Sequence, residues 1–256
     1  MLVAERYEKI VELVNERGSI RVSELSELCS VTEETIRRDL DRLEQAGRLR
    51  RSHGGAVSVK DSDAIAQPET PYSEREIIRA DDKRRIALEA IKLIAPKDRI
   101  LLDASSTAWY MAREMPDIPL TVLTNSIKVA LELAGKEKIE VISTGGQLAR
   151  GSLSYVGPLA ERSLDAYHVD KLFLSCKGVH LERGISESNE LQARIKHKMI
   201  GMADEVYVLA DSSKFGVQSF THVSDLAEVN RIVTDRRLPR ETVQELEARG
   251  ITVSTV

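Results

Sequence analysis

Apolar residues recur at every third or fourth position through the first part of the chain, the spacing of helices with one buried face. The pattern predicts three short helices, with Gly18 and Gly47 as stop signals and Thr32 as the N-cap of the third. The predicted buried positions are Val3, Tyr7, Ile10 and Val14 in the first helix, Val22, Leu25 and Leu28 in the second, and Ile36, Leu40 and Leu43 in the third.

A short basic segment follows the third helix. Residues 48–57 form two alternating runs joined at Gly54 and Gly55, which predicts a β-hairpin. Three helices and a hairpin make up a winged helix-turn-helix, a module that places one helix in the major groove of DNA. We therefore predict a DNA-binding domain over residues 1–58.

The third helix carries the candidate base-reading side chains. Arg38 is expected opposite the buried stripe, and an arginine can donate two hydrogen bonds to guanine or bind a backbone phosphate. The alternative is a solvated helix face whose arginines are balanced by Asp39 and Asp41; the basic hairpin favours DNA binding. The predicted DNA-contacting residues are Thr32, Glu34, Thr35, Arg37, Arg38, Arg42, Arg48, Arg50, Arg51, His53 and Gly54.

A second domain is predicted over residues 76–256. Residues 59–75 contain two prolines, several acidic residues and no periodicity, which indicates a linker. Beyond it, short apolar runs alternate with helical segments, which predicts an α/β domain with a mostly parallel sheet and helices on both faces. The seven runs are 99–103, 120–124, 139–143, 171–175, 205–211, 230–234 and 251–254.

Five of these predicted strands end in polar or glycine-rich turns. The turns carry hydroxyls, backbone N–H groups at helix starts, and the lysines Lys177 and Lys214. Since the carboxyl ends of parallel strands meet at one edge of a sheet, we expect a phosphate monoester to bind there. The turns are 103–107, 124–126, 143–146, 175–178 and 211–216.

Two motifs together resemble a known family. Residues 34–40, Glu-Thr-Ile-Arg-Arg-Asp-Leu, followed by Gly47 and by His-Gly-Gly at 53–55, are similar to the DeoR family of bacterial sugar-metabolism regulators. The resemblance extends over nearly the whole chain and implies a sensor domain that is like sugar-phosphate isomerases in fold and binds phosphorylated sugars. The residues that match its ligand loops are Asp103, Ser105, Ser106, Thr107, Thr124, Asn125, Gly145, Gly146, Lys196, Asp211, Ser213 and Lys214.

The resemblance also suggests roles and an effector. It implies that phosphate rests on the 105–107 turn with Lys214 or Lys196 as counter-charge, and that Asp103 and Asp211 bind sugar hydroxyls. The chain departs from the family's usual Asp-x-Gly-Thr-Thr at 103–107, and it has Gln192 where an acidic residue is common. The loops are most similar to those of fucose and rhamnose regulators, which implies a 6-deoxy-ketohexose 1-phosphate effector.

Composition limits the alternatives only slightly. The net charge is -4, and residues 1–60 contain eleven basic and eleven acidic residues. DNA binding would therefore depend on how the charges are arranged, and we expect it to need a homo-oligomer, a dimer or tetramer. Cys29 and Cys176 are far apart, and the histidines show no metal-ligand spacing, so neither a metal nor a cofactor is expected. Without a signal peptide or a membrane-spanning run, we expect a cytoplasmic protein and no membrane partner.

Two other function classes remain open at this stage. A sugar-phosphate isomerase would use a carboxylate such as Asp103 or Asp211 as base, but it has no use for a winged helix. A scaffold that binds only proteins would have no affinity for an operator. The sequence favours a non-enzymatic regulator without catalytic residues, whose partners are double-stranded operator DNA and a phosphorylated sugar.

Overall fold

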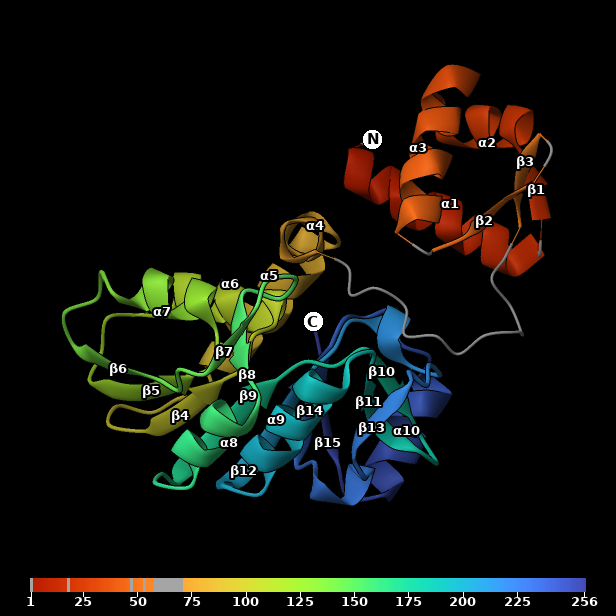
Figure 1. The fold of residues 1–256 in the computed structure, drawn as a ribbon. Coiled ribbons are helices and arrows are strands. Elements are labelled where there is room, and N and C mark those ends of the chain that lie inside the picture. Colours follow the sequence, from red (N-terminus) through yellow and green to blue (C-terminus); the bar gives the residue numbers. More distant parts are fainter. Residues whose placement is uncertain (1, 18, 47, 53, 58–70) are drawn as a thin grey trace. The chain divides into compact units, whose positions relative to one another are not determined.

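The chain divides into two compact units, residues 1–79 and 80–256, and each is described by itself. The computed structural model describes residues 2–17, 19–46, 48–52, 54–57 and 71–256 (Figure 1). Most of the predicted linker, the predicted helix stop Gly47 and the predicted DNA contact His53 therefore lie outside the described residues. A short helix, α4 (Tyr72–Ile77), closes the first unit.

The amino-terminal unit is a winged helix-turn-helix, as predicted. Its elements in chain order are α1 (Val3–Arg17), β1 (Ser19–Arg21), α2 (Val22–Cys29), α3 (Glu33–Gln45), β2 (Arg50–Ser52) and β3 (Gly55–Val57). The hairpin β2–β3 is joined by β1, a strand that the sequence analysis missed, in the antiparallel order β1-β3-β2. Gly55 is required there, because a Cβ atom would lie 2.2 Å from the carbonyl oxygen of Ile20.

The core of this unit follows the predicted stripes except at Val3 and Leu28, which were predicted to be buried and are exposed. Thr32 caps α3 as expected, its side chain accepting a hydrogen bond from the Thr35 N–H. The buried stripe of α2 consists of Val22, Leu25 and Cys29, as expected for Cys29, and Leu28 lies outside this stripe. Asp39 does not balance the surface arginines: it is buried and forms an ion pair with Arg6 of α1.

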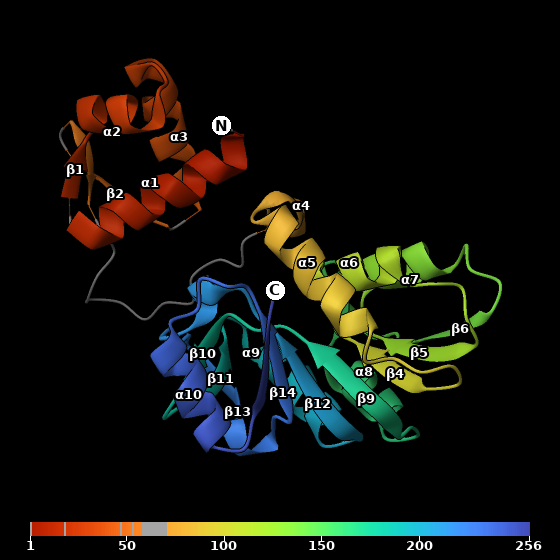
Figure 2. The same ribbon diagram turned by 180° about the vertical axis from the view of Figure 1, so that it is seen from behind.

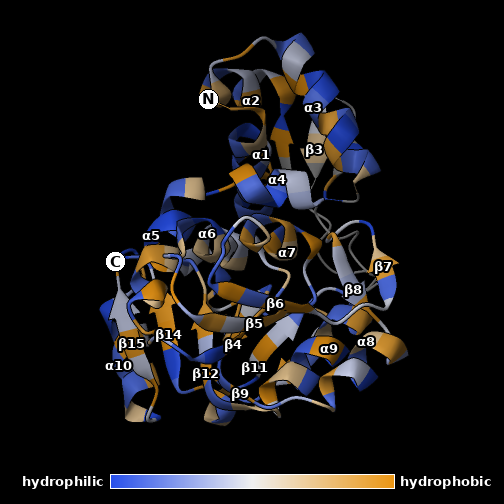
Figure 3. Ribbon diagram, turned by 90° about the vertical axis from the view of Figure 1, so that its left-hand side faces the viewer, coloured by the Kyte–Doolittle hydropathy of each residue, from blue (hydrophilic) through white to orange (hydrophobic). Residues whose placement is uncertain are grey.

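The second unit is built on a seven-stranded, fully parallel sheet, which confirms all seven predicted strands. The order across the sheet is β15-β14-β12-β9-β4-β5-β6 (Figures 1 and 2). The strands are β4 (Arg99–Leu102), β5 (Leu120–Thr124), β6 (Ile139–Ser143), β9 (Val169–Leu174), β12 (Ala203–Leu209), β14 (Arg231–Thr234) and β15 (Thr252–Thr255). Figure 3 shows apolar residues along these strands.

Helices cover both faces of the sheet, so the strands are buried on both sides. Helices α5, α6 and α7 pack side by side over one face. Helices α8, α9 and α10 share a second core with alternate strand residues such as Leu101, Leu172 and Val208. The bounds are α5 (Ala80–Ile91), α6 (Ser106–Glu114), α7 (Ile127–Leu133), α8 (Pro158–Leu164), α9 (Glu190–Ile200) and α10 (Arg240–Ala248).

Short antiparallel strands and two single-turn helices, none of them predicted, complete the second unit. A three-stranded sheet has the order β10-β11-β13, and β7 pairs with β8. The bounds are β7 (Gln147–Ala149), β8 (Ser154–Val156), β10 (Gly178–His180), β11 (Gly184–Glu187), β13 (Thr221–Ser224), η1 (Ser212–Lys214) and η2 (Leu226–Glu228). Several of these elements bring polar residues to the carboxyl edge of the large sheet.

Candidate functional site

The exposed face of α3 presents two arginines. The side chain of Arg38 is 74% exposed, and its Nε lies 3.4 Å from Glu34. Arg37 is 48% exposed, and its guanidinium donates to Glu33 at 2.5 Å. These are surface pairs within one helix, which contribute little stability and break easily. Arg38 is therefore the side chain of this face that is most available to a partner.

Other predicted contacts on α3 have partners within the unit. The Thr32 and Thr35 hydroxyls lie 2.9 Å apart in the helix cap. Arg42 is exposed and donates to the Tyr7 hydroxyl at 3.2 Å, and that bond raises the pKa of Arg42. These side chains are positioned by the fold before any partner is present.

The arginines of the hairpin differ in how far their side chains are exposed. Arg48 is only 18% exposed and is paired with Glu8 of α1 at 2.7 Å. Arg51 is more exposed and is paired with Asp41, while its backbone N–H donates to Glu44. Gly54 has φ of +85° and forms the turn. Arg50 lies in β2, but its side chain is outside the described part of the structure.

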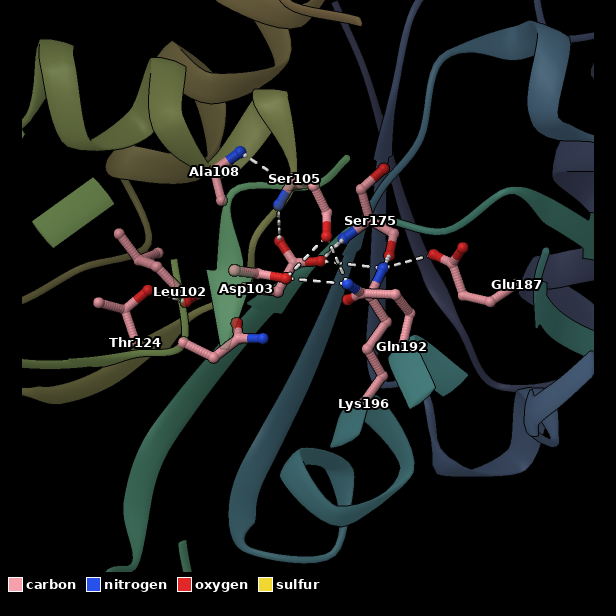
Figure 4. Close-up of polar contacts among 12 residues, drawn as sticks. Leu102, Asp103, Ser105, Ala108, Thr124, Ser175, Glu187, Gln192 and Lys196 are labelled. Carbon is pink, nitrogen blue, oxygen red and sulfur yellow. Dashed lines mark hydrogen bonds and ion pairs between the residues drawn. The ribbon is translucent and has the colours of Figure 1, made fainter. Parts of the chain in front are cut away.

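In the second unit, the parallel topology brings the predicted strand-end turns to one edge. Asp103 follows β4 and is buried, with three donors around its carboxylate (Figure 4). The Ser105 and Ser175 N–H groups each donate to it at 3.1 Å, and the Lys196 Nζ lies 3.2 Å away. Asp103 therefore ties the end of β4 to the end of β9 and to α9.

Lys196 is the buried cation of this edge. Its Nζ contacts the Ser175 carbonyl oxygen at 2.6 Å, the Glu187 carboxylate at 2.5 Å and Asp103. Burial alone would lower the pKa of Lys196, but the carboxylates of Glu187 and Asp103 outweigh it and raise that pKa. An ammonium has three hydrogens, so these three contacts use all of its donors. With one cation and two anions, the cluster has one net negative charge.

The neighbouring turns are also ordered by internal hydrogen bonds. Ser105 caps α6 by accepting from the Ala108 N–H, and Ser106 and Thr107 are buried in the first turn of this helix. Thr124 donates to the Leu102 carbonyl oxygen at 2.7 Å. The amide nitrogen of Asn125 donates to the Tyr155 carbonyl oxygen at 3.0 Å, while its amide oxygen is buried without a partner in the part of the chain described.

Gly145 and Gly146 form the turn after β6, and both have positive φ. A Cβ atom on Gly146 would lie 2.8 Å from the Cβ of Ala160 in α8, whereas one on Gly145 would meet open space. Gly146 therefore has a packing requirement of its own. Any role of this turn in binding would fall to the more open Gly145.

The turn after β12 carries Asp211, Ser213 and Lys214. Asp211 is buried and caps η1, accepting from the backbone N–H and the hydroxyl of Ser213. Lys214 is partly exposed. Burial raises the pKa of the Cys176 thiol to about 12, and the positive charges of Lys196 and Lys214 oppose this rise, so both lysines act on Cys176.

The same turn is fixed from the next strand by Asp235, a residue that follows β14. Asp235 accepts from the Ser212 N–H at 2.7 Å and from the Arg237 guanidinium at 2.8 Å. Burial alone would raise the pKa of Asp235, but its hydrogen bonds to Arg237 and Ser212 lower that pKa well below its usual range. Arg237 also bonds to Asp82 in the first turn of α5.

Among the described residues of this edge, the carboxylates considered as a base are already engaged by other groups. Proton abstraction requires a carboxylate that is free to accept a proton from the substrate. Asp103 and Glu187 are paired with the buried Lys196, and Asp211 accepts twice from Ser213. The geometry therefore disfavours the isomerase alternative, in which Asp103 or Asp211 would be the base.

Several residues of this edge were not predicted from the sequence. Glu187 and Asp235 gave no signal, because their partners come from distant segments that only the topology brings near. Gln192 was noted only as a departure from the family pattern; here its amide donates to Ser152 and Ser154, close to Lys196 (Figure 4).

The described residues contain no group of three or more histidine, cysteine, aspartate or glutamate side chains arranged to hold a metal ion. Among the same residues, every helix is too short or too polar to span a bilayer.

Comparisons with known proteins agree with these features. A DeoR-like helix-turn-helix domain matches residues 6–62, and a DeoR C-terminal sensor domain matches residues 78–236. An uncharacterized HTH-type transcriptional regulator, YulB of Bacillus subtilis, is 56% identical over 100% of this chain and 98% of its own. The L-fucose operon activator of Haemophilus influenzae is 43% identical over 96% of this chain and 97% of its own.

Among solved structures, ribose 5-phosphate isomerase A of Methanocaldococcus jannaschii is 21% identical, with a TM-score of 0.40 over 53% of this chain and 54% of its own. A similarity at this level supports no conclusion about activity. The family matches and the relatives, by contrast, extend over both units. The chain therefore belongs to the DeoR family, and it is a DNA-binding transcriptional regulator with a C-terminal sensor domain and not an enzyme.

Proposed function

We propose that this regulator controls a carbohydrate-use operon and that a phosphorylated 6-deoxy-ketohexose is its effector. The observation that carries the proposal is the carboxyl edge of the parallel sheet, where hydroxyls, helix-start N–H groups and Lys214 gather. Relatives named as activators of the L-fucose operon support a deoxysugar. The intact chain is expected to act in the cytoplasm as a dimer or tetramer, because one winged helix makes few phosphate contacts.

Within the proposed site, the phosphate is assigned to the start of α6. The N–H groups of the first helical turn, at Ser106 and Thr107, have no acceptor within their own helix. Lys214 is the better candidate for counter-charge, because the hydrogens of Lys196 are already engaged by Glu187, Asp103 and Ser175. Asn125 contributes an amide oxygen, which has no partner among the described residues, for a sugar hydroxyl.

The proposed DNA interface is the exposed face of α3 together with the hairpin β2–β3. Arg38 is assigned to a base edge and Arg51 to the DNA backbone, on the grounds of exposure and position. Effector binding shifts the oligomer between arrangements of different operator affinity, with a coupling of about 1–3 kcal/mol.

A gel-shift titration tests the function as a whole. The intact protein is titrated onto DNA from upstream of its own operon, with phosphorylated deoxysugars or with their unphosphorylated parents. One phosphorylated sugar should change the half-saturating protein concentration by roughly 5- to 150-fold, and its parent should not. If no member of a broad phosphosugar panel changes binding, the sensing proposal fails.

Arg38→Ala should weaken operator binding by about 1–3 kcal/mol, because the lost side chain would bond a base edge. The loss should be much smaller on non-operator DNA, so specificity falls with affinity. Fluorescence anisotropy with operator DNA and with non-operator DNA measures the two losses of affinity. Arg194→Ala, which removes an exposed arginine of α9, is the control. Unchanged operator affinity for the Arg38 variant would remove this residue from the interface.

Lys214→Ala should leave DNA binding intact and weaken the response to effector. Because a charge-assisted hydrogen bond contributes about 1.5–3 kcal/mol, the half-effective effector concentration should rise at least tenfold. A gel-shift titration over effector concentration measures this value. Lys198→Ala, on the exposed side of α9, is the matched control. A normal response of the Lys214 variant would reassign the counter-charge to another cation.

A further inference from the structure

Gln192 is a buried polar side chain in the first turn of α9, one helical turn before Lys196, so both side chains lie on the same face of the helix. Figure 4 shows the two beside Asp103. The Gln192 amide nitrogen donates to the Ser152 hydroxyl at 2.7 Å and to the Ser154 hydroxyl at 2.8 Å. The two hydroxyls are themselves 2.8 Å apart.

One placement of the hydrogens in this cluster satisfies all of its contacts and orients the amide. Each serine hydroxyl has one hydrogen. Ser152 also lies in donor geometry to the Ala149 carbonyl oxygen at 3.4 Å, and Ser154 can supply the hydrogen of the serine–serine contact. With the hydrogens placed in this way, both serine oxygens remain as acceptors for a donor from the third member. The NH2 group of Gln192 is that donor, which leaves its amide oxygen as an acceptor.

A glutamate at this position would not satisfy the same contacts. A carboxylate only accepts, so it would need both serine hydrogens for itself. The serine–serine contact and the bond to the Ala149 carbonyl oxygen would then lose their donors. The serine pair therefore fits a neutral, donating side chain at position 192.

The segment of residues 152–155, which holds Gln192, also holds Asn125. The Tyr155 N–H donates to the backbone carbonyl oxygen of Asn125 at 2.8 Å, and the Asn125 side-chain nitrogen donates to the backbone carbonyl oxygen of Tyr155 at 3.0 Å. That nitrogen faces a group that can only accept, so the orientation of the Asn125 amide is fixed as well. Its oxygen is buried and has no partner among the described residues.

We propose that Gln192, oriented by Ser152 and Ser154, determines which end group the effector carries. With Asn125 it presents neutral amide oxygens that accept hydrogen bonds from the hydroxyls of an uncharged sugar. A sugar acid would place its carboxylate against these two acceptor oxygens and near the Asp103 and Glu187 carboxylates, which Lys196 alone does not balance. An amino sugar would carry an ammonium group, and the neutral Gln192 does not supply the negative charge that an acidic side chain at this position would offer it. The inference rests on the proposed function and adds specificity to the same site.

Isothermal titration calorimetry on the intact protein tests the inference with three kinds of probe. They are neutral ketohexose 1-phosphates including 6-deoxy forms, glucosamine 6-phosphate as an amino sugar, and 6-phosphogluconate as a sugar acid. The wild-type protein should bind one neutral sugar phosphate at least tenfold more tightly than either charged probe. Gln192→Glu should reduce that affinity at least tenfold, and it should narrow or reverse the preference over glucosamine 6-phosphate.

Two controls keep the outcomes distinct. Gln244→Glu places the same change on the exposed side of α10 and should leave the preferences unchanged. Ser152→Ala removes one acceptor of the Gln192 amide without adding charge, and it should weaken binding of the neutral probe several-fold even if the Gln192 variant fails to fold.

The results separate the inference from the function on which it rests. If the wild type binds a neutral sugar phosphate and Gln192→Glu keeps the wild-type affinities, the inference is overturned and the proposed function stands. If Gln192→Glu does not fold, wild-type affinities of Ser152→Ala overturn the inference in the same way. If the wild type binds none of the probes, the effector proposal and the inference fall together.

Discussion

Arg6→Met should destabilise the amino-terminal unit by roughly 3–5 kcal/mol, because it leaves the buried Asp39 carboxylate without its counter-charge. The two side chains are only 9% and 5% exposed, and the Arg6 guanidinium donates two bonds to Asp39. The stability of so small a unit is of the same order as this loss, so operator binding should disappear while the sensor unit remains folded.

Two spectroscopic signals measure this result in the intact chain. Trp109 is the only tryptophan and lies in α6, so its fluorescence follows the sensor unit alone, while circular dichroism follows both units. Arg17→Met, which breaks an exposed pair with Glu24, should change stability by less than about 1 kcal/mol. The double variant Arg6→Met/Asp39→Leu should recover much of the loss, since an apolar pair replaces a buried ionic one at little cost. No recovery would mean that Arg6 contributes mainly through packing.

Lys196→Met should destabilise the sensor unit by a similar amount, about 3–5 kcal/mol, because it removes the single cation between two buried carboxylates. The loss should depend on pH. Burial without a counter-charge raises the pKa of a carboxylate. In the acidic range the folded variant therefore binds more protons than the unfolded chain. Its free energy of unfolding should then rise as the pH falls from 8 towards about 5.

Urea denaturation followed by Trp109 fluorescence at several pH values measures this dependence. Lys198→Met is the matched control, since Lys198 lies on the same helix in an exposed pair with Asp165; its effect should stay within about 0.5 kcal/mol and show no rescue in acid. A Lys196 variant as stable as the wild type would show that Glu187 and Asp103 find other partners.

The main elements of the fold could be predicted because their signals are local. The seven parallel strands are short continuous apolar runs, as expected of strands buried on both faces. The unpredicted strands β1, β7, β8, β10, β11 and β13 have three or four residues each, too few for a period to show. Their pairing depends on contacts with distant parts of the chain.

The candidate site was predictable in position and not in detail. The turns at Asp103, Thr124 and Asp211 had to meet at one edge once the sheet was known to be parallel. The engagement of Lys196 was not predictable, because Glu187 comes from β11, a strand outside the large sheet. Asp39 likewise looked like one more charge on a polar helix until Arg6 was seen opposite it.

The bonds around Asp235 have a mechanical consequence. Ser212, Asp235, Arg237 and Asp82 form an unbroken series from the turn that carries Lys214 to the beginning of α5, the first helix of the second unit. These bonds tie the turn after β12 to the first turn of α5, so the position of one segment constrains the position of the other. Because Asp235 and Asp82 are buried, water has little access to compete for the bonds, and the spacing of the two segments is held firmly.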